Sequence, residues 1–196
     1  AVSDDIELRT KRLLLRPFRI ADVDDVYDYA KDPEWARFLL PMIPQPYTRR
    51  DAEEFIARRV VASWSIDSAF AIVLDSVVVG GINLHVDERH EKGERGYSLA
   101  RAYWGKGLTT EAARAVVDWG FSQLSLAKVY ASADLRNAGS WRVMEKTGMP
   151  REGVLRSHTT TRDGRADQVF YGILRPEWEE ASAREHQGSR PSKPRC

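Results

Sequence analysis

Apolar residues recur at i, i+3, i+4 and i+7 in several parts of the chain, and most of these parts open on a residue that can cap a helix. Asp22, Thr48 and Asn137 are such capping residues, and Gly148 stands where the last of these parts should stop. The predicted helices cover 23–30, a short stretch from Pro33 that carries Trp35 and Phe38, 49–64, 110–124 and 138–147. The helices at 23–30 and 110–124 each carry one apolar stripe.

Short runs of β-branched and aromatic residues between the helices predict strands. These strands cover 10–18, 69–75, 77–86, 95–100, 127–133 and two runs within 153–174. Asp75–Ser76 and Asp163–Gly164 are two-residue turn signals, so each is expected to close a hairpin. The helix at 110–124 joins the strands at 95–100 and 127–133 as a crossover, and these two strands should therefore be parallel.

Length and charge narrow the class of protein. The chain has 196 residues, which suits one domain with its own core, and 30 Lys+Arg against 29 Asp+Glu give a formal net charge of +1. No broad basic surface for nucleic acid or an anionic membrane is expected from this balance. The single cysteine, Cys196, and four histidines without ligand spacing predict neither a disulfide framework nor a metal site.

No apolar run approaches the length of a membrane span, and the charged start does not resemble a signal peptide. We therefore expect a cytoplasmic protein. Residues 1–181 are expected to form the single domain, and the polar, basic segment 182–196 to be a disordered tail.

Two glycines stand one residue apart in "RAYWGKGLTTEAA" (101–113), between a strand and a helix. The first amides of a helix have no intrahelical acceptor, and Gly105 and Gly107 allow further N–H groups to turn inward, so this junction suits a diphosphate. A plain tight turn is the alternative interpretation. The P-loop pattern is absent, and Thr110 occupies the third glycine position of a dinucleotide fingerprint.

Trp104–Thr109, "WGKGLT", resembles the acyl-CoA motif [QR]-x-x-G-x-[GA] of the GNAT N-acetyltransferase superfamily, with Trp104 in place of Gln/Arg and Thr109 in place of Gly/Ala. Four longer segments resemble the RimJ/RimL-like branch, which modifies the N-termini of ribosomal proteins. They are "TKRLLLRPF", "ADVDDVYDYAKDPEWARFL", "GYSLARAYWGKGLTTEA" and "NAGSWRVMEKTGM". Together the resemblance covers roughly residues 8–175.

The resemblance implies an α/β (α+β) fold with a mixed, mostly antiparallel, twisted sheet flanked by helices. This sheet would splay between its fourth and fifth strands, here about 94–100 and 127–133, where the pantetheine of acetyl-CoA inserts. The residues implied to bind this cosubstrate are Leu99, Ala100 and Arg101 beside the pantetheine, Trp104, Gly105, Lys106, Gly107, Leu108, Thr109 and Thr110 around the pyrophosphate, and Asn137. There are alternatives to a role in cosubstrate binding. Arg101 and Lys106 would then be solvated surface cations, and Asn137 would only cap its helix.

The resemblance also implies that a primary amine attacks the thioester of acetyl-CoA directly in a ternary complex. At pH 7 about a tenth of α-amines but under a thousandth of lysine amines are neutral, so an N-terminal acceptor needs less help from a base. Glu94 matches a family acidic position and is the candidate base, and Ser140 matches a position proposed to protonate the leaving thiolate. A solvated carboxylate and a serine that caps its own turn are the alternatives. A backbone amide near Leu99 would stabilise the oxyanion.

The first-choice acceptor is a protein N-terminal α-amine, such as that of a ribosomal protein. A small-molecule amine (a polyamine, an aminoglycoside or an amino acid) and a non-catalytic acyl-CoA-binding module stay open, as does the choice between acetyl and longer acyl groups. His85 and Tyr97 are candidates for the acceptor pocket, although a structural role is the commoner one for such a histidine. A homodimer is expected only from the resemblance, and neither a metal, a nucleic acid nor a membrane is expected as a partner.

Overall fold

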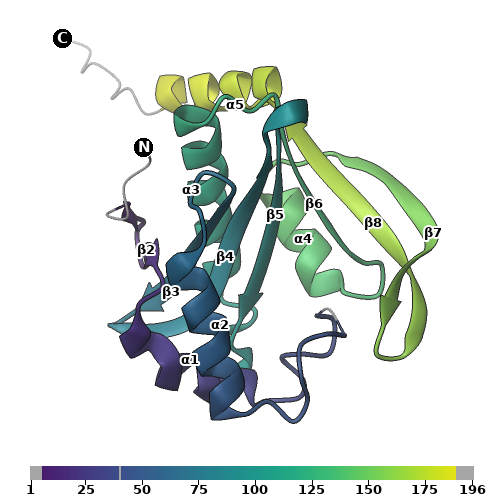
Figure 1. Cartoon of the computed structure of the whole chain (residues 1–196). Coiled ribbons are helices and arrows are strands. Elements are labelled where there is room, and N and C mark those ends of the chain that lie inside the picture. The colour runs from purple at the N-terminus through teal and green to yellow at the C-terminus, as the bar shows by residue number, and fades with distance from the viewer. Residues whose placement is uncertain (1–5, 40, 189–196) are drawn as a thin grey trace.

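The computed structural model describes residues 6–39 and 41–188, which form a twisted eight-stranded sheet with helices on both faces (Figure 1). The strands are β1 (Leu8–Arg9), β2 (Leu14–Pro17), β3 (Asp67–Leu74), β4 (Val77–Asp87), β5 (Lys92–Leu99), β6 (Lys128–Asp134), β7 (Arg151–Thr161) and β8 (Gly164–Leu174). The α-helices are α1 (Val23–Ala30), α2 (Arg49–Val61), α3 (Leu108–Gln123), α4 (Ala138–Lys146) and α5 (Arg175–Gly188).

The sheet order is β1-β2-β3-β4-β5-β6-β8-β7, and all neighbours are antiparallel except β5 and β6. This arrangement confirms the predicted mixed, mostly antiparallel α/β fold. The first predicted strand, 10–18, corresponds to β2 alone, and β1 precedes it. The two are separated by a turn in which the Thr10 amide donates to the Leu13 carbonyl over 2.9 Å. The fourth and fifth strands of the prediction are therefore β5 and β6.

The two faces of the sheet bury two separate sets of apolar side chains. On β3, Phe70 and Ile72 belong to the cluster that includes α3 and α4, whereas Ala69 and Ala71 belong to the cluster that includes α1 and α2. Successive side chains of a strand point to opposite faces, so one strand contributes to both cores. Phe70 packs edge-on against Trp119 of α3, with ring centroids 5.3 Å apart.

Beyond three pairs of residues, β5 and β6 separate. Their parallel register runs from Lys92 opposite Lys128 to Glu94 opposite Tyr130, and both strands then continue without pairing to each other. Figure 1 shows β5 and β6 diverging from this shared end. The predicted splay is therefore confirmed, and it frees one edge of β5.

Asp22 precedes α1 as predicted, but the prediction that it caps this helix is wrong. Its carboxylate makes no cap hydrogen bond to α1; it pairs with Arg16 over 2.8 Å and accepts the Arg19 amide over 2.7 Å.

The other turns and caps agree closely with the sequence pattern. Asp75 and Ser76 have positive φ angles of 49° and 69°, and the β7–β8 turn ends at Gly164 with a φ of 107°. Thr48 and Asp51 form a capping box at the start of α2, which ends at Val61 rather than at residue 64. These features depend on neighbours within a few residues, and this is why the sequence predicts them.

The short helix expected from Pro33 is absent, and residues 32–39 form successive turns instead. Trp35 packs against Tyr29 and Tyr47, with ring centroids 5.4 Å and 6.2 Å away. This aromatic contact anchors the segment from the side, and so short a stretch has too few hydrogen bonds to offset helix nucleation.

The C-terminal boundary also differs from the prediction. α5 continues to Gly188, so residues 182–188 are helical, whereas we placed them in a disordered tail; the rest of that segment, 189–196, lies outside the described residues. Trp178 fixes α5 by stacking on Phe121 at 5.1 Å and by donating its indole N–H to Asp118 over 2.7 Å. Across the described residues, no helix is long and apolar enough to cross a membrane.

Candidate active site

A cavity of about 740 Å³ opens where β5 and β6 separate. Six segments line it: the end of β5, the loop that leads into α3, the first turn of α3, α4 along its length, residues within 34–39, and Asp163 at the tip of the β7–β8 hairpin. Of the residues predicted for acetyl-CoA and for catalysis, nine line this cavity. They are Leu99, Trp104, Gly105, Gly107, Leu108, Thr109, Thr110, Asn137 and Ser140.

The loop before α3 has the backbone angles that its glycines permit. Gly105 and Gly107 have φ angles of +73° and +76°, and Gly107 is the N-cap of α3. A Cβ on Gly105 would meet no atom within 4 Å, and one on Gly107 would lie 3.6 Å from Arg12 Nη2. Positive φ, rather than crowding by protein atoms, therefore requires glycine here.

The start of α3 presents amide donors to the cavity. Glu111 donates its amide to the Gly107 carbonyl over 3.1 Å, so the helical hydrogen-bond ladder begins there. The amides of Leu108, Thr109 and Thr110 precede it and have no intrahelical acceptor. The positive end of the helix dipole adds to them, and this geometry suits an anion.

An ion pair from the N-terminal segment fixes this loop, and the sequence analysis missed it. Arg12 donates through Nε to Glu111 over 2.7 Å and through Nη1 to the Lys106 carbonyl over 2.9 Å. Thr10 Oγ1 donates to the same Glu111 carboxylate over 2.6 Å. Burial acts to raise the pKa of Glu111, but the hydrogen bonds from Thr10 and Arg12 outweigh it, so the pKa is lowered. An acidic residue in the first turn of α3 was the only local signal.

Trp104, the departure from the family motif, links this loop to the sheet. Its indole N–H donates to the Leu99 carbonyl at the end of β5 over 2.6 Å, while 48% of the residue stays exposed. The side chain therefore fixes the junction between β5 and the loop that precedes α3.

Ser140 and Tyr97 meet across the cavity. Tyr97 donates its hydroxyl to the Ser140 carbonyl over 2.8 Å and lies 3.0 Å from Ser140 Oγ. Asn137 caps α4 by accepting the Ser140 amide on Oδ1 over 3.2 Å. Since Asn137 is the cap, the Ser140 hydroxyl is not used to cap its own turn.

Four of the predicted site residues lie outside the cavity. Glu94 is exposed and accepts a hydrogen bond from Tyr130 over 3.1 Å, in a separate hollow that also includes His85. Arg101 pairs with Asp32 over 2.7 Å in a third hollow, which Ala100 also lines. Lys106 places Nζ 5.2 Å from the ring centroid of Tyr103. Burial and the neighbouring Glu94 raise the pKa of Tyr130 to about 12.

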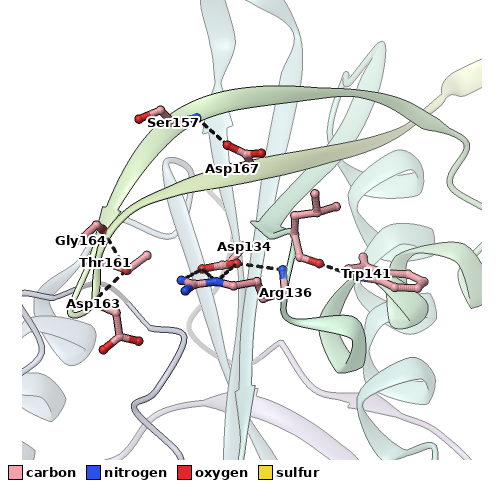
Figure 2. A network of polar contacts seen from close by, with 9 residues as sticks. Asp134, Arg136, Trp141, Ser157, Thr161, Asp163, Gly164 and Asp167 are labelled. Atoms are coloured by element: carbon pink, nitrogen blue, oxygen red, sulfur yellow. Dashed lines mark hydrogen bonds and ion pairs between the residues drawn. The ribbon is translucent and has the colours of Figure 1, made fainter.

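Polar contacts hold the turn between β6 and α4 (Figure 2). Arg136 donates its amide to Asp134 Oδ1 over 2.9 Å and its Nη2 to Asp134 Oδ2 over 2.6 Å. These hydrogen bonds lower the pKa of the buried Asp134 carboxyl. Trp141 donates its indole N–H to the Leu135 carbonyl over 3.2 Å, and the start of α4 is thereby fixed beside the cavity.

A second set of contacts shapes the β7–β8 hairpin, which Figure 2 shows above and to the left of the first. The Asp167 carboxylate accepts the Ser157 amide over 2.8 Å at an irregularity in β7, and Thr161 Oγ1 donates to the Gly164 carbonyl over 3.0 Å. At the tip, Arg162 donates to the Ile43 carbonyl. The hairpin therefore bridges to the irregular segment after α1, and the two together border the cavity.

Comparison with known families gives one match that spans most of the chain. The model described as "Acetyltransferase (GNAT) domain" matches residues 12–150. The matched range includes the splayed strands, the loop before α3 and the start of α4.

Curated relatives are similar over different lengths. YnaD of Bacillus subtilis, an uncharacterized N-acetyltransferase, is 29% identical over 88% of this chain and 99% of its own length. YdaF of the same organism, named as a candidate ribosomal N-acetyltransferase, is 34% identical over 55% of this chain and 60% of its own. Spermidine N(1)-acetyltransferase of Escherichia coli (strain K12) is 32% identical over 44% of this chain and 47% of its own.

Solved structures share the fold. A GNAT-family acetyltransferase from Bacillus anthracis superposes with a TM-score of 0.78 at 28% identity, over 87% of this chain and 99% of that one. RimL, a ribosomal L7/L12 alpha-N-protein acetyltransferase in complex with coenzyme A, superposes with a TM-score of 0.79 at 13% identity, over 86% and 98%.

Proposed function

The chain belongs to the GNAT acetyltransferase family, and from this premise we propose that it transfers the acetyl group of acetyl-CoA to a protein N-terminal α-amine. Acyl-CoA-dependent N-acyl transfer follows from the family match and from the N-acetyltransferases to which the chain is similar. The acceptor, the RimJ/RimL-like branch and the role of each residue are parts of the proposal.

One observation carries the assignment of the cosubstrate site: the freed edge of β5 and the N-terminus of α3 open into the same cavity. An extended pantetheine arm has amide groups that pair with a strand edge, and a pyrophosphate suits the amides of Leu108, Thr109 and Thr110. Arg142 and Lys146 also line the cavity and supply positive charge toward the nucleotide phosphates. Leu99, Trp104, Gly105, Gly107 and Asn137 complete the proposed site.

Ser140 is the proposed proton donor of the reaction. As the amine nitrogen bonds to the acetyl carbon, the carbon–sulfur bond breaks, and the Ser140 hydroxyl gives its proton to the thiolate that leaves. The excess proton of the amine passes to water, and a proton returns from water to Ser140 at the end of the cycle. A hydroxyl aligned by Tyr97 and not used as a cap supports this role. The proposal assigns no role to Glu94, the candidate base, because it lies in another hollow.

The lining of the cavity favours an α-amine over a more basic amine. Among the described residues that line it there is no histidine, and the carboxylates are Glu34 and Asp163. An α-amine, with a reference pKa near 8, needs little help to lose its proton, whereas an amine near 10 needs a strong base. Arg37 and Arg136 share the lining, and this charge balance disfavours a polycation such as spermidine.

An amine panel tests the acceptor. Peptides with a free N-terminus and no lysine, the same peptides N-terminally blocked with one internal lysine, spermidine, an aminoglycoside and free amino acids are each mixed with acetyl-CoA. Released thiol gives kcat/KM, and mass spectrometry locates the acetyl group. We expect the free N-terminal peptides to have the highest kcat/KM. Faster turnover of spermidine or the aminoglycoside would assign a small-molecule acceptor, and acetyl-CoA binding without turnover of any amine would assign a binding module.

A further inference from the structure

Arg95 on β5 is the largest of the fully buried side chains in the described residues, with 2% of its surface exposed. Its Nη1 lies 3.5 Å from Thr147 Oγ1, which is long for an N–H···O hydrogen bond, and its Nη2 lies 3.5 Å from Met149 Sδ, a weak acceptor. Within the described residues Nε has no partner and no carboxylate pairs with the guanidinium. A buried charge without a carboxylate is costly, so its retention calls for a reason.

The nearest group that benefits from this charge is Tyr97. The two residues lie two positions apart on β5 and therefore share a face, and Arg95 Cζ is 5.3 Å from the centroid of the Tyr97 ring. Burial lowers the pKa of Arg95 to about 10, which leaves it protonated at neutral pH. Burial raises the pKa of Tyr97, while Arg95 and the hydrogen bond with Ser140 act to lower it. A continuous path of contacts thus leads from the buried cation to the Ser140 hydroxyl.

We propose that Arg95 is a positioning residue for the reaction, which holds the Tyr97 phenol against Ser140 and makes it a stronger proton donor to Ser140 Oγ. The inference rests on the proposed function, because it needs Ser140 to face the leaving thiolate. Arg95 itself does not line the cavity, so it acts only through Tyr97 and Ser140.

The proton balance explains why such a path is useful. A serine hydroxyl is a far weaker acid than a thiol with a reference pKa near 8.5, whereas the reference value of a phenol is near 10. Burial raises the pKa of Tyr97 above that value, and the charge of Arg95 acts against this rise. At rest the single Tyr97 hydroxyl proton is donated to the Ser140 carbonyl, 2.8 Å away, and Ser140 Oγ is 3.0 Å away. In the reaction Ser140 gives its proton to sulfur while the Tyr97 proton turns from the carbonyl to Ser140 Oγ, and water returns a proton to Tyr97 after the thiol leaves. The positive charge of Arg95 stabilises the negative charge that forms on the phenol in the meantime, in surroundings of low dielectric constant.

The experiment follows the thiol pKa of bound CoA, through the ultraviolet absorbance of the thiolate, and kcat with the best amine of the panel. The variants are Arg95→Met, Arg95→Lys, Tyr97→Phe and Ser140→Ala, with the double variant Arg95→Met/Ser140→Ala. Ile82→Val, a buried change opposite Tyr97 on β4, is the matched packing control. The charged groups that line the cavity are Glu34, Arg37, Arg136, Arg142, Lys146 and Asp163; they are the same in every protein and cancel in the comparison.

We expect Arg95→Met to raise the bound thiol pKa by about one unit and to lower kcat about tenfold, with the affinity for CoA unchanged. Arg95→Lys should restore part of both effects, and Tyr97→Phe should match Arg95→Met. In the Ser140→Ala background, Arg95→Met should have no further effect. Ile82→Val should lower thermal stability but leave the thiol pKa unchanged.

Each of the other outcomes overturns one part of the proposal. An unchanged thiol pKa and kcat in Arg95→Met, or effects that add to those of Ser140→Ala, overturn the role of Arg95. A normal Ser140→Ala enzyme overturns the proposed donor instead, and absence of CoA binding overturns the proposed site. Should Arg95→Met fail to fold, Arg95→Lys and Tyr97→Phe decide by the same readouts. The thiol measurement needs no amine, so it decides even where the acceptor is misassigned.

Discussion

The two halves of the cavity are built in different ways. The half around the start of α3 uses main-chain groups, set by the positive φ angles of Gly105 and Gly107 and held by Arg12. The half around Ser140 uses side chains and irregular segments, including Tyr97 and the hairpin tip that reaches Ile43. A site for a common cosubstrate can depend on the backbone, whereas a site for a particular acceptor depends on side chains that differ between relatives.

The largest effect should come from a negative charge among the amides of the first half. Thr109→Glu should weaken acetyl-CoA binding about a thousandfold, since two like charges about 4 Å apart near a protein surface repel by ~4 kcal/mol. Thermal stability should not fall, because an acidic residue suits a helix N-terminus. Calorimetry and thermal melting separate the two effects.

Gln123→Glu is the matched control, because it adds the same charge at the other end of α3. Its affinity for acetyl-CoA should equal that of the parent protein. If Thr109→Glu bound acetyl-CoA as tightly as the parent protein, the proposal that the diphosphate lies at the start of α3 would be wrong.

A substitution in the half around Ser140 should lower the rate of the reaction and leave the affinity for acetyl-CoA unchanged. Ser140→Ala should lower kcat about a hundredfold, the lower range for loss of a general acid, while calorimetry should give an unchanged dissociation constant for acetyl-CoA. A parent-like kcat would show that Ser140 has no part in proton transfer, and a loss of affinity would place Ser140 in the first half.

Loss of the Arg12–Glu111 ion pair, which fixes the loop before α3, should have a smaller effect on acetyl-CoA affinity. Arg12→Ala should raise the dissociation constant of acetyl-CoA about tenfold, because a charge-assisted hydrogen bond to the Lys106 carbonyl is lost. Arg9→Ala removes an exposed arginine that pairs with Glu7 in the same segment, and it should leave binding unchanged. Equal binding by both variants would mean that the loop keeps its shape without Arg12.

The contact between the hairpin tip and the Ile43 carbonyl should affect the binding of the acceptor and not that of acetyl-CoA. Arg162→Ala removes the donor to the Ile43 carbonyl and should raise KM for the peptide about threefold, the value of one exposed hydrogen bond. The dissociation constant of acetyl-CoA should not change. A change in acetyl-CoA affinity instead of KM would contradict the division between the halves.

The smallest effect concerns pH. The folded state lowers the pKa of Glu111, so its contribution to stability is present above the pKa of the unfolded chain and is lost as pH falls through the lower folded value. Between neutral pH and strongly acidic pH, the parent should therefore lose more stability than Glu111→Gln, as chemical denaturation at each pH would show. Parallel curves for the two proteins would mean that the Glu111 carboxylate gains nothing from Thr10 and Arg12.

The sequence predicted well what depends on nearby residues. The caps at Thr48 and Asn137, the Asp75–Ser76 hairpin and the glycine loop before α3 all follow from backbone angles and hydrogen bonds within about four residues. The parallel pair and its splay followed from the crossover helix and the family resemblance.

Side-chain placement was less predictable. Glu94 and Tyr97 stand three positions apart on one strand, so they face opposite sides of the sheet, and only Tyr97 reaches the cavity. Arg101 was expected beside the cosubstrate, but the carboxylate of Asp32 holds it elsewhere. Strand alternation would have separated the first two, whereas no local pattern identifies the partner of Arg101.

By itself, then, the sequence determined the order of the elements, most of their caps and turns, and the glycine-containing loop before the N-terminus of α3. Only the tertiary structure decided that Arg12 would hold Glu111 from 99 positions away and that Arg95 would be buried behind Tyr97. The physical reason is the distance along the chain over which each kind of interaction acts. Backbone conformation responds to the nearest residues, whereas the meeting of two side chains depends on how the whole sheet packs and on which face each strand presents.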